Sequence, residues 1–169
     1  MTTTDTDGSG AAHPRFAEAL RELGLDGLTA QVRRFPDATR TAAEAAAAIG
    51  CELSQICKSL IFVADGVPVL VLMDGASRVD LERVREELGA AKVTRAKAEV
   101  VREATGYAIG GVPPFGHRTK TRVLADRSLF AHDLVWAAAG TPYAVFPITP
   151  KDLVAYAGAT LVDVRERIA

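Results

Sequence analysis

Residues 56–73 read Ile-Cys-Lys-Ser-Leu-Ile-Phe-Val-Ala-Asp-Gly-Val-Pro-Val-Leu-Val-Leu-Met, and they carry the strongest indication of the fold. Residues 60–63 form one continuous apolar run, and residues 67–73 form another. Asp65-Gly66 between them is typical of a tight hairpin turn, which needs positive backbone φ angles. Two apolar strands joined in this way predict a buried hairpin at the centre of a sheet.

Helices and strands surround this hairpin without a regular strand–helix–strand repeat. Thr41-Ala-Ala-Glu44 is a capping box, and Thr149-Pro150 is an N-cap followed by proline; Asp80 and Thr94 are further expected helix caps. The pattern predicts helices over residues 14–23, 41–50, 80–88, 94–105 and 149–157, and strands over 28–35, 121–125, 134–138, 143–148 and 160–164. We therefore expect a mixed α/β (α+β) fold: one domain with a mixed, mostly antiparallel sheet and packed helices.

The chain has 169 residues, a length that suits one domain with a sizeable core. Residues 1–12 are expected to form a flexible tail, which leaves residues 13–169 as the folded domain. No apolar run approaches the ~20 residues needed to cross a membrane, and the first residues do not resemble a signal peptide. Two cysteines make no disulfide framework. We expect a cytoplasmic protein with no membrane partner.

The charge balance argues against broad nucleic-acid binding. The chain has 20 basic and 21 acidic residues, whereas proteins that grip long stretches of nucleic acid usually have a strong basic excess. We therefore expect no DNA partner, and any contact with RNA to be local.

Several common catalytic and metal-binding motifs are missing from the sequence. It contains no G-x-S-x-G nucleophile elbow and no H-E-x-x-H zinc motif. Cys51 and Cys57 are six residues apart, which is not the spacing of a C-x-x-C site, and the three histidines are scattered. We therefore expect neither a metal nor another cofactor.

Lys58 is unusual because it comes immediately before the most apolar run in the chain. A lysine there reaches solvent, pairs with a carboxylate or faces a pocket. Burial beside apolar walls would lower its pKa and make it chemically useful. A structural lysine that reaches water is the alternative.

A second candidate is the loop of residues 105–117, Thr-Gly-Tyr-Ala-Ile-Gly-Gly-Val-Pro-Pro-Phe-Gly-His. Its glycines allow close backbone approach, and Pro113 and Pro114 stiffen it. A rigid loop of this kind can aim backbone N–H groups at an anion or at a developing oxyanion. A tight structural crossover between two elements would have the same composition.

A short basic segment, His117-Arg-Thr-Lys-Thr-Arg122, follows the loop. On an extended strand Arg118, Lys120 and Arg122 would share one face, where they could contact phosphates. A solvated strand edge explains the same charges without a ligand. Arg33-Arg34 is a second basic pair with the same two interpretations.

Five other side chains are weaker candidates. Phe35 either walls a pocket or packs at an edge, and Trp136 is expected in the core. His132, beside Asp133, is expected at the surface, and both cysteines are expected to be inert buried thiols.

Taken together, these segments resemble the YbaK family, which is related to the editing domain inserted in some bacterial prolyl-tRNA synthetases. The resemblance covers residues 28–164. Its elements occur in the family's order: Thr41-Ala-Ala-Glu-Ala-Ala, Gln55-Ile-Cys-Lys-Ser-Leu, the strand of residues 67–73, Arg78-Val-Asp80, Thr105-Gly-Tyr, the loop of residues 110–117, Gly140 and Asp152-Leu153. The Lys-Ser-Leu and Gly-Gly-x-x-Pro segments are more specific together than either is alone.

The resemblance implies a cytosolic trans-editing enzyme that hydrolyses mischarged aminoacyl-tRNA, without a metal. It implies a small amino acid, tRNA-Pro as the tRNA, and the tRNA acceptor end and prolyl-tRNA synthetase as partners. It assigns catalytic roles to Lys58 and Gly111. The basic segment after the loop makes Arg118 and Lys120 the expected tRNA contacts. The implied substrate-binding residues are Phe35, Gly110, Val112, Pro113, Pro114, His117 and Gly140.

The expected chemistry is attack on an ester carbonyl, whose oxygen becomes negatively charged. Backbone N–H groups near Gly110 and Gly111 would stabilise that charge, and Lys58 would hold the terminal nucleotide or polarise the ester. No side chain is an obvious general base, so water, a ribose hydroxyl or the substrate itself is the expected nucleophile, positioned rather than activated. The alternatives are a non-catalytic module that binds a nucleotide or tRNA end, and a hydrolase of small esters.

Overall fold

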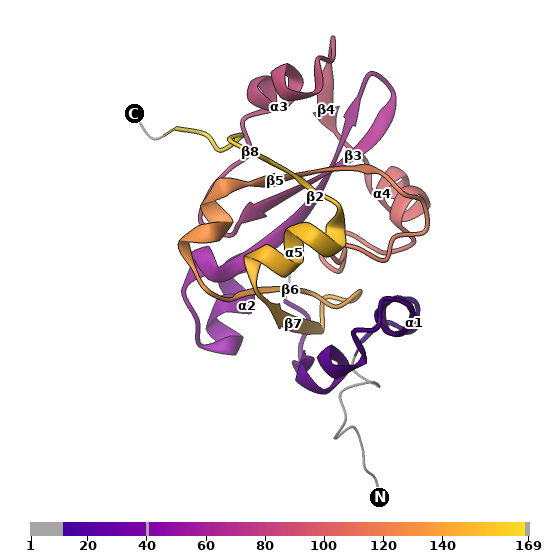
Figure 1. Ribbon diagram of the computed structural model, residues 1–169, viewed down its shortest axis with the longest axis vertical. Coiled ribbons are helices and arrows are strands. Elements are labelled where there is room, and N and C mark those ends of the chain that lie inside the picture. The colour runs from indigo at the N-terminus through magenta and orange to yellow at the C-terminus, as the bar shows by residue number, and fades with distance from the viewer. Residues whose placement is uncertain (1–11, 40, 168–169) are drawn as a thin grey trace, which may run out of the picture.

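The expected hairpin lies at the centre of an eight-stranded sheet in the computed structural model, which describes residues 12–39 and 41–167 (Figure 1). Strand β2 (Ile56–Ala64) pairs antiparallel with β3 (Val67–Asp74) from Cys57 to Ala64. Asp65 and Gly66 both have positive φ angles, 48° and 83°, as this kind of turn requires. The central hairpin is therefore as the sequence predicts, with β2 beginning four residues before the apolar run.

The sheet is mixed, as expected, and its strand order is β1-β7-β6-β2-β3-β5-β8, with β4 also paired to β2. Four of the seven strand pairings are antiparallel, and three are parallel: β2 with β6, β3 with β5, and β5 with β8. The remaining strands are β1 (Arg33–Arg34), β4 (Val93–Arg95), β5 (Arg122–Asp126), β6 (Val135–Ala138), β7 (Ala144–Ile148) and β8 (Thr160–Val162).

Local capping signals place most helices where the sequence predicts them. Thr41 and Glu44 form the capping box of α2, and the Thr149 side chain accepts from the Asp152 N–H at the start of α5. The α-helices are α1 (Pro14–Glu22), α2 (Ala42–Ile49), α3 (Leu81–Leu88), α4 (Ala98–Thr105) and α5 (Pro150–Ala157), and the 3₁₀ helices are η1 (Asp26–Gln31), η2 (Leu53–Gln55) and η3 (Arg127–Ala131).

Two segments differ from expectation. The sequence predicts a strand over residues 28–35, but the first half of this range, residues 28–31, lies in η1, where the Thr29 hydroxyl donates to the Asp26 carbonyl oxygen at 2.6 Å. Only Arg33 and Arg34 reach the sheet edge. Thr94 does not cap α4: it lies in β4, opposite Val63, because pairing with the central strand outweighs its capping tendency.

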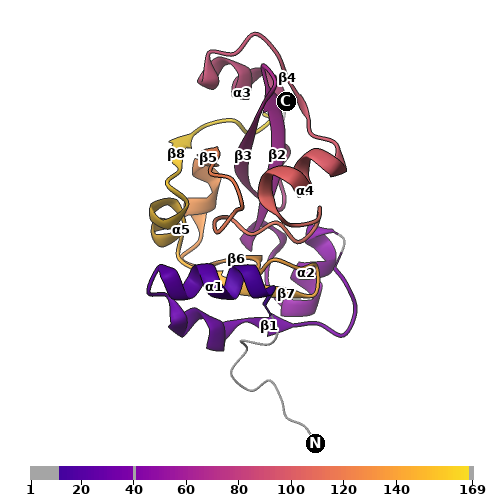
Figure 2. The ribbon, with the colours of Figure 1, turned by 90° about the vertical axis from the view of Figure 1, so that its right-hand side faces the viewer.

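The core lies on both faces of the β2–β3 hairpin, because successive strand residues point to opposite sides. One cluster contains Ile61 together with Phe16 and Leu20 of α1, and α1 lies across β6 and β7 (Figure 2). The other contains Phe62 of β2 and Val84 of α3.

Of the predicted tail, residues 1–11 lie outside the described residues, and Ala12 is buried. Across the described residues, no helix is both long and apolar enough to cross a membrane.

One edge of β2 is covered only at its two ends. Strand β6 pairs with it at Ile56 and Cys57, and β4 pairs with it at residues 62–64. Within the part of the chain that the structure describes, no strand pairs with residues 58–61 along this edge. We call this uncovered stretch of residues 58–61 the β2 gap, and its residues line a cavity.

Candidate functional site

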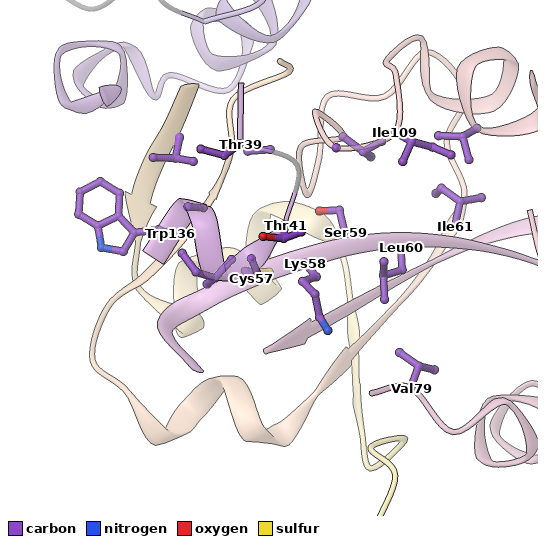
Figure 3. A pocket seen from close by; sticks show the side chains of 18 of the residues that line it. Thr39, Thr41, Cys57, Lys58, Ser59, Leu60, Ile61, Val79, Ile109 and Trp136 are labelled. Carbon is purple, nitrogen blue, oxygen red and sulfur yellow. The ribbon is translucent and has the colours of Figure 1, made fainter. Parts of the chain in front are cut away.

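A cavity of about 590 Å³ surrounds the β2 gap and has walls from both faces of the sheet (Figure 3). Lys58 and Ser59 project from opposite faces of β2: Ser59 points toward the side of Thr41 and Ile109, and Lys58 toward the side of Val79. The Ser59 side of the cavity is mainly apolar, with Ile61, Val101 and Val112 of one core cluster among its walls. Among the described residues that line the cavity, none is acidic.

Lys58 is half-buried, and its position in β2 fixes its direction because it lies opposite Met73 of β3. Its ammonium group donates a 2.6 Å hydrogen bond to the Ser77 carbonyl oxygen. Burial lowers the pKa of Lys58, the Asp74 carboxylate opposes that shift, and the charges of two arginines lower the pKa further. An ammonium group has three N–H donors, so two remain available for a ligand.

The two arginines are Arg78 and Arg95, which line the same cavity as Lys58. Both are exposed, and in residues 12–39 and 41–167 neither guanidinium group has a salt-bridge partner. Neither residue is among the site residues expected from the sequence. Arg78 follows β3 and Arg95 ends β4, so only the folded sheet brings them to one place. The Lys58 side of the cavity therefore carries three positive charges.

The Gly-Pro loop supplies the opposite wall through Ile109, Gly110 and Val112. Gly110 has a φ of 91°, which favours glycine. Gly111 approaches the backbone of Thr141 so closely that a Cβ atom added to Gly111 would lie 2.8 Å from the Thr141 Cα. The Gly111 N–H donates to the Ala108 carbonyl oxygen at 2.9 Å, so it is engaged within the loop itself.

The remaining loop residues of the expected set lie behind this wall. Pro113 and Pro114 are buried, and neither lines the cavity. His117 Nε2 lies 2.5 Å from the Pro113 carbonyl oxygen, so Nε2 carries the proton in this contact. Burial lowers the pKa of His117, and its hydrogen bond to Pro113 partly opposes this. His117 therefore supports the loop and does not face the cavity.

Phe35 and Gly140 also lie outside the cavity lining. Phe35 is buried beside β7, and its N–H donates to the Tyr143 carbonyl oxygen at 2.7 Å. Gly140 has a φ of 96° and leaves no room for a side chain beside His13. The structure thus brings Lys58, Gly110 and Val112 together at one cavity and places Phe35 and Gly140 in its surroundings.

The basic segment lies on the surface away from the cavity lining. Arg118 and Lys120 are exposed, but residues 118–121 form no strand, so the expected shared face does not arise. The Arg118 N–H bonds to the Thr105 carbonyl oxygen at 2.8 Å, which holds the segment against the end of α4. Arg122 begins β5.

Three of the weaker candidates also have defined environments. Trp136 is half-buried and lines the cavity, although the sequence predicts it in the core, and the Arg33 guanidinium lies 5.6 Å from its ring centroid. His132 Nε2 is 2.7 Å from the Ser54 hydroxyl. Burial, assisted by the nearby Asp74 charge, raises the pKa of Cys57 to about 12, which keeps this thiol protonated. Over the described residues, no group of three or more His, Cys, Asp or Glu side chains is arranged to hold a metal ion.

Comparisons with known proteins identify relatives of this chain. The profile of the aminoacyl-tRNA editing domain matches residues 36–156. The uncharacterized protein YwhH of Bacillus subtilis (strain 168) is 36% identical over 123 residues, which cover 72% of this chain and 78% of YwhH. The proline–tRNA ligase of Geobacter sp. (strain M21) is 36% identical over 86 residues, which cover 51% of this chain and 15% of the ligase.

A solved structure has the same architecture over its whole length. It is the crystal structure of a protein proposed to be a trans-editing enzyme for prolyl tRNA synthetase, and it aligns with a TM-score of 0.85 and 41% sequence identity. The alignment covers 98% of this chain and 100% of that one.

Proposed function

The chain belongs to the aminoacyl-tRNA editing domain family, and from that premise we propose that it is a trans-editing deacylase that hydrolyses mischarged aminoacyl-tRNA. The observation that carries this proposal is one cavity lined at once by Lys58, by Gly110 and by small apolar side chains. A charged nucleotide end and a small acyl group are the two parts of such a substrate, and the two sides of the cavity suit them.

Lys58, Arg78 and Arg95 form the wall that we assign to the terminal nucleotide. Phosphate groups are the natural ligands of lysine and arginine side chains that lack acidic partners. Lys58 is also the cation nearest to the β2 gap, since it belongs to that stretch of strand. We therefore assign Lys58 to the ester end of the nucleotide, where its free N–H donors stabilise the negative charge that develops on the ester oxygen.

The opposite wall positions the carbonyl group. The Gly110 region supplies a fixed backbone against which the ester lies, and Gly111 holds that backbone against Thr141. Since the Gly111 N–H is already bonded to Ala108, we assign this glycine a shaping role in catalysis. Oxyanion donors are worth about 2.7–4 kcal/mol each in acyl-transfer enzymes.

Hydrolysis then needs only a positioned nucleophile. A water molecule or the neighbouring ribose hydroxyl adds to the carbonyl carbon, and the bond between that carbon and the ester oxygen of the ribose breaks. The departing oxygen takes a proton, and when the ribose hydroxyl attacks, water completes the hydrolysis. Holding the reacting atoms together accounts for a large part of such rate enhancements.

Small apolar side chains in the cavity select the amino acid by size. Ala42, Ala45, Ala138 and Ala144 line the cavity, and their small side chains leave room for a small acyl group such as alanine, serine or cysteine. A cavity of this kind rejects larger groups by steric exclusion, as the second sieve of editing enzymes does. We assign tRNA-Pro as the substrate tRNA and prolyl-tRNA synthetase as the partner whose errors are corrected, on the strength of the relatives of this chain.

Two assays on the same charged tRNA separate this function from its alternatives. The protein is incubated with tRNA-Pro carrying alanine, serine, cysteine or proline, and both filter binding and release of the labelled amino acid are measured. The proposal expects release of at least one small amino acid and no release of proline. Binding without release would identify a non-catalytic module instead, and hydrolysis of p-nitrophenyl acetate alone would identify an esterase.

A further inference from the structure

The β2 gap leaves one backbone acceptor, the Ser59 carbonyl oxygen, inside the cavity without a strand partner. The Ile61 carbonyl oxygen accepts a 3.3 Å hydrogen bond from the Ala96 N–H, so the polar backbone groups of Ile61 face this edge. Successive strand residues turn these groups to alternate edges. The Ser59 carbonyl therefore faces the same edge, in the middle of the gap.

Ser59 brings a second acceptor to this place. Its hydroxyl oxygen is buried and has no hydrogen-bond partner among the described residues. Figure 3 shows the side chain on the side of β2 that faces Thr41 and Ile109, which is the apolar side of the cavity. A buried hydroxyl without a partner is unfavourable, and a ligand that supplies one relieves that cost.

We propose that Ser59 is the positioning residue for the α-amino group of the aminoacyl ester, which donates to its hydroxyl and carbonyl oxygens. This rests on the proposed function. The α-carbon of the bound amino acid carries both its amino group and its side chain. When that side chain lies in the apolar part of the cavity, the amino group therefore lies near the Ser59 face of β2. An amino group has N–H donors whether it is neutral or protonated.

The subsite makes the protein specific for esters with a free α-amino group. Acylation of that nitrogen removes donors and adds bulk where the buried Ser59 hydroxyl leaves no space. N-acylated aminoacyl-tRNA is therefore a poor substrate, even when its side chain is small.

The test compares hydrolysis of alanyl-tRNA-Pro and N-acetylalanyl-tRNA-Pro, each rate divided by the spontaneous rate of the same ester in buffer. Wild type is expected to prefer the free amine by about tenfold or more, the effect of a hydrogen bond to a charged group. Ser59→Ala loses most of this preference, Ser59→Thr keeps it, and Ser128→Ala outside the cavity leaves it unchanged. The melting temperature is measured for each variant.

Each other outcome overturns a definite part of the proposal. Equal corrected rates for both esters in wild type overturn the subsite and leave the proposed function intact. A Ser59→Ala variant that slows both esters by the same factor shows that the hydroxyl does not contact the amino group. Hydrolysis of neither ester overturns the proposed function and the subsite together.

Discussion

The Lys58 ammonium group donates a 2.6 Å hydrogen bond to the Ser77 carbonyl oxygen, which ties the first part of β2 to the segment after β3. This bond directs the side chain along the cavity wall next to Arg78. A lysine that merely reached solvent would not need it. The contact is therefore the reason that a half-buried cation has one orientation in this cavity.

We expect the charge of Lys58 to set the alkaline limit of the proposed activity. Burial lowers its pKa, so the ammonium group is lost at a pH below the ordinary lysine value of about 10.4. We expect deacylation, corrected for spontaneous hydrolysis, to fall as pH rises through that lowered pKa. Lys58→Arg stays charged throughout, so its residual activity should show no alkaline fall. If activity falls at the same alkaline pH in wild type and in Lys58→Arg, deprotonation of Lys58 is not the cause of the fall.

The same shift predicts the direction of a stability change. The folded-state pKa of Lys58 lies below its unfolded value, so protonation favours the unfolded chain below both values. This destabilisation of the folded state disappears as pH rises from the folded-state pKa to the unfolded-state pKa. We expect the melting temperature of wild type to rise relative to Lys58→Met across this window, measured by calorimetry at several alkaline pH values. A constant difference would contradict the burial of this charge.

Gly111→Ala should distort the loop, because its added Cβ would lie 2.8 Å from the Thr141 Cα. We expect a loss of activity of about tenfold or more with a modest decrease in melting temperature, since strained contacts of this kind typically cost about 1–3 kcal/mol. Gly27→Ala is the matched control, because its Cβ would meet no atom within 4 Å. If both variants behave alike, the close approach at Gly111 has no role in catalysis.

Two pairs of cations are candidates for the proposed tRNA contact. Arg78 and Arg95 line the cavity, whereas Arg118 and Lys120 lie on the surface outside its lining. We expect the double variant Arg78→Ala/Arg95→Ala to have a higher KM for aminoacyl-tRNA. The logarithm of its tRNA-binding constant should also depend less steeply on the logarithm of the salt concentration, with a slope reduced by roughly 0.7 for each phosphate that these two side chains neutralise. The Arg118→Ala and Lys120→Ala pair should cause a similar change if that segment contacts the acceptor stem. A salt dependence that changes in neither double variant would remove both surfaces from the interface.

Most of the fold was predictable because its signals are local. The Thr41–Glu44 capping box and the Asp65-Gly66 turn depend on neighbouring residues, and the structure contains both. The β2 gap has no such signal. It arises because β6, which is distant in the sequence, pairs parallel with β2 at Ile56 and Cys57 and then leaves that edge.

The residues that line the candidate site were predictable to a similar extent. Lys58 and the Gly-Pro loop stand out in the sequence by composition, and both reach the cavity. Arg78, Arg95 and Trp136 reach it only through strand pairing, so no spacing in the sequence connects them. Ser59 is next to Lys58 in the sequence, yet its role depends on which face of β2 it occupies.

Hydrolysis of aminoacyl-tRNA at the β2 gap depends, in this mechanism, on Lys58. The decisive measurement is the single-turnover rate of alanyl-tRNA-Pro hydrolysis by wild type and by Lys58→Ala, with the melting temperature of both proteins recorded. We predict hydrolysis by wild type and a decrease of about 100-fold in Lys58→Ala, the usual effect of removing a group that stabilises an oxyanion, with little change in melting temperature. Equal rates in two folded proteins, or no hydrolysis by wild type of tRNA-Pro charged with alanine, serine or cysteine, would contradict this mechanism.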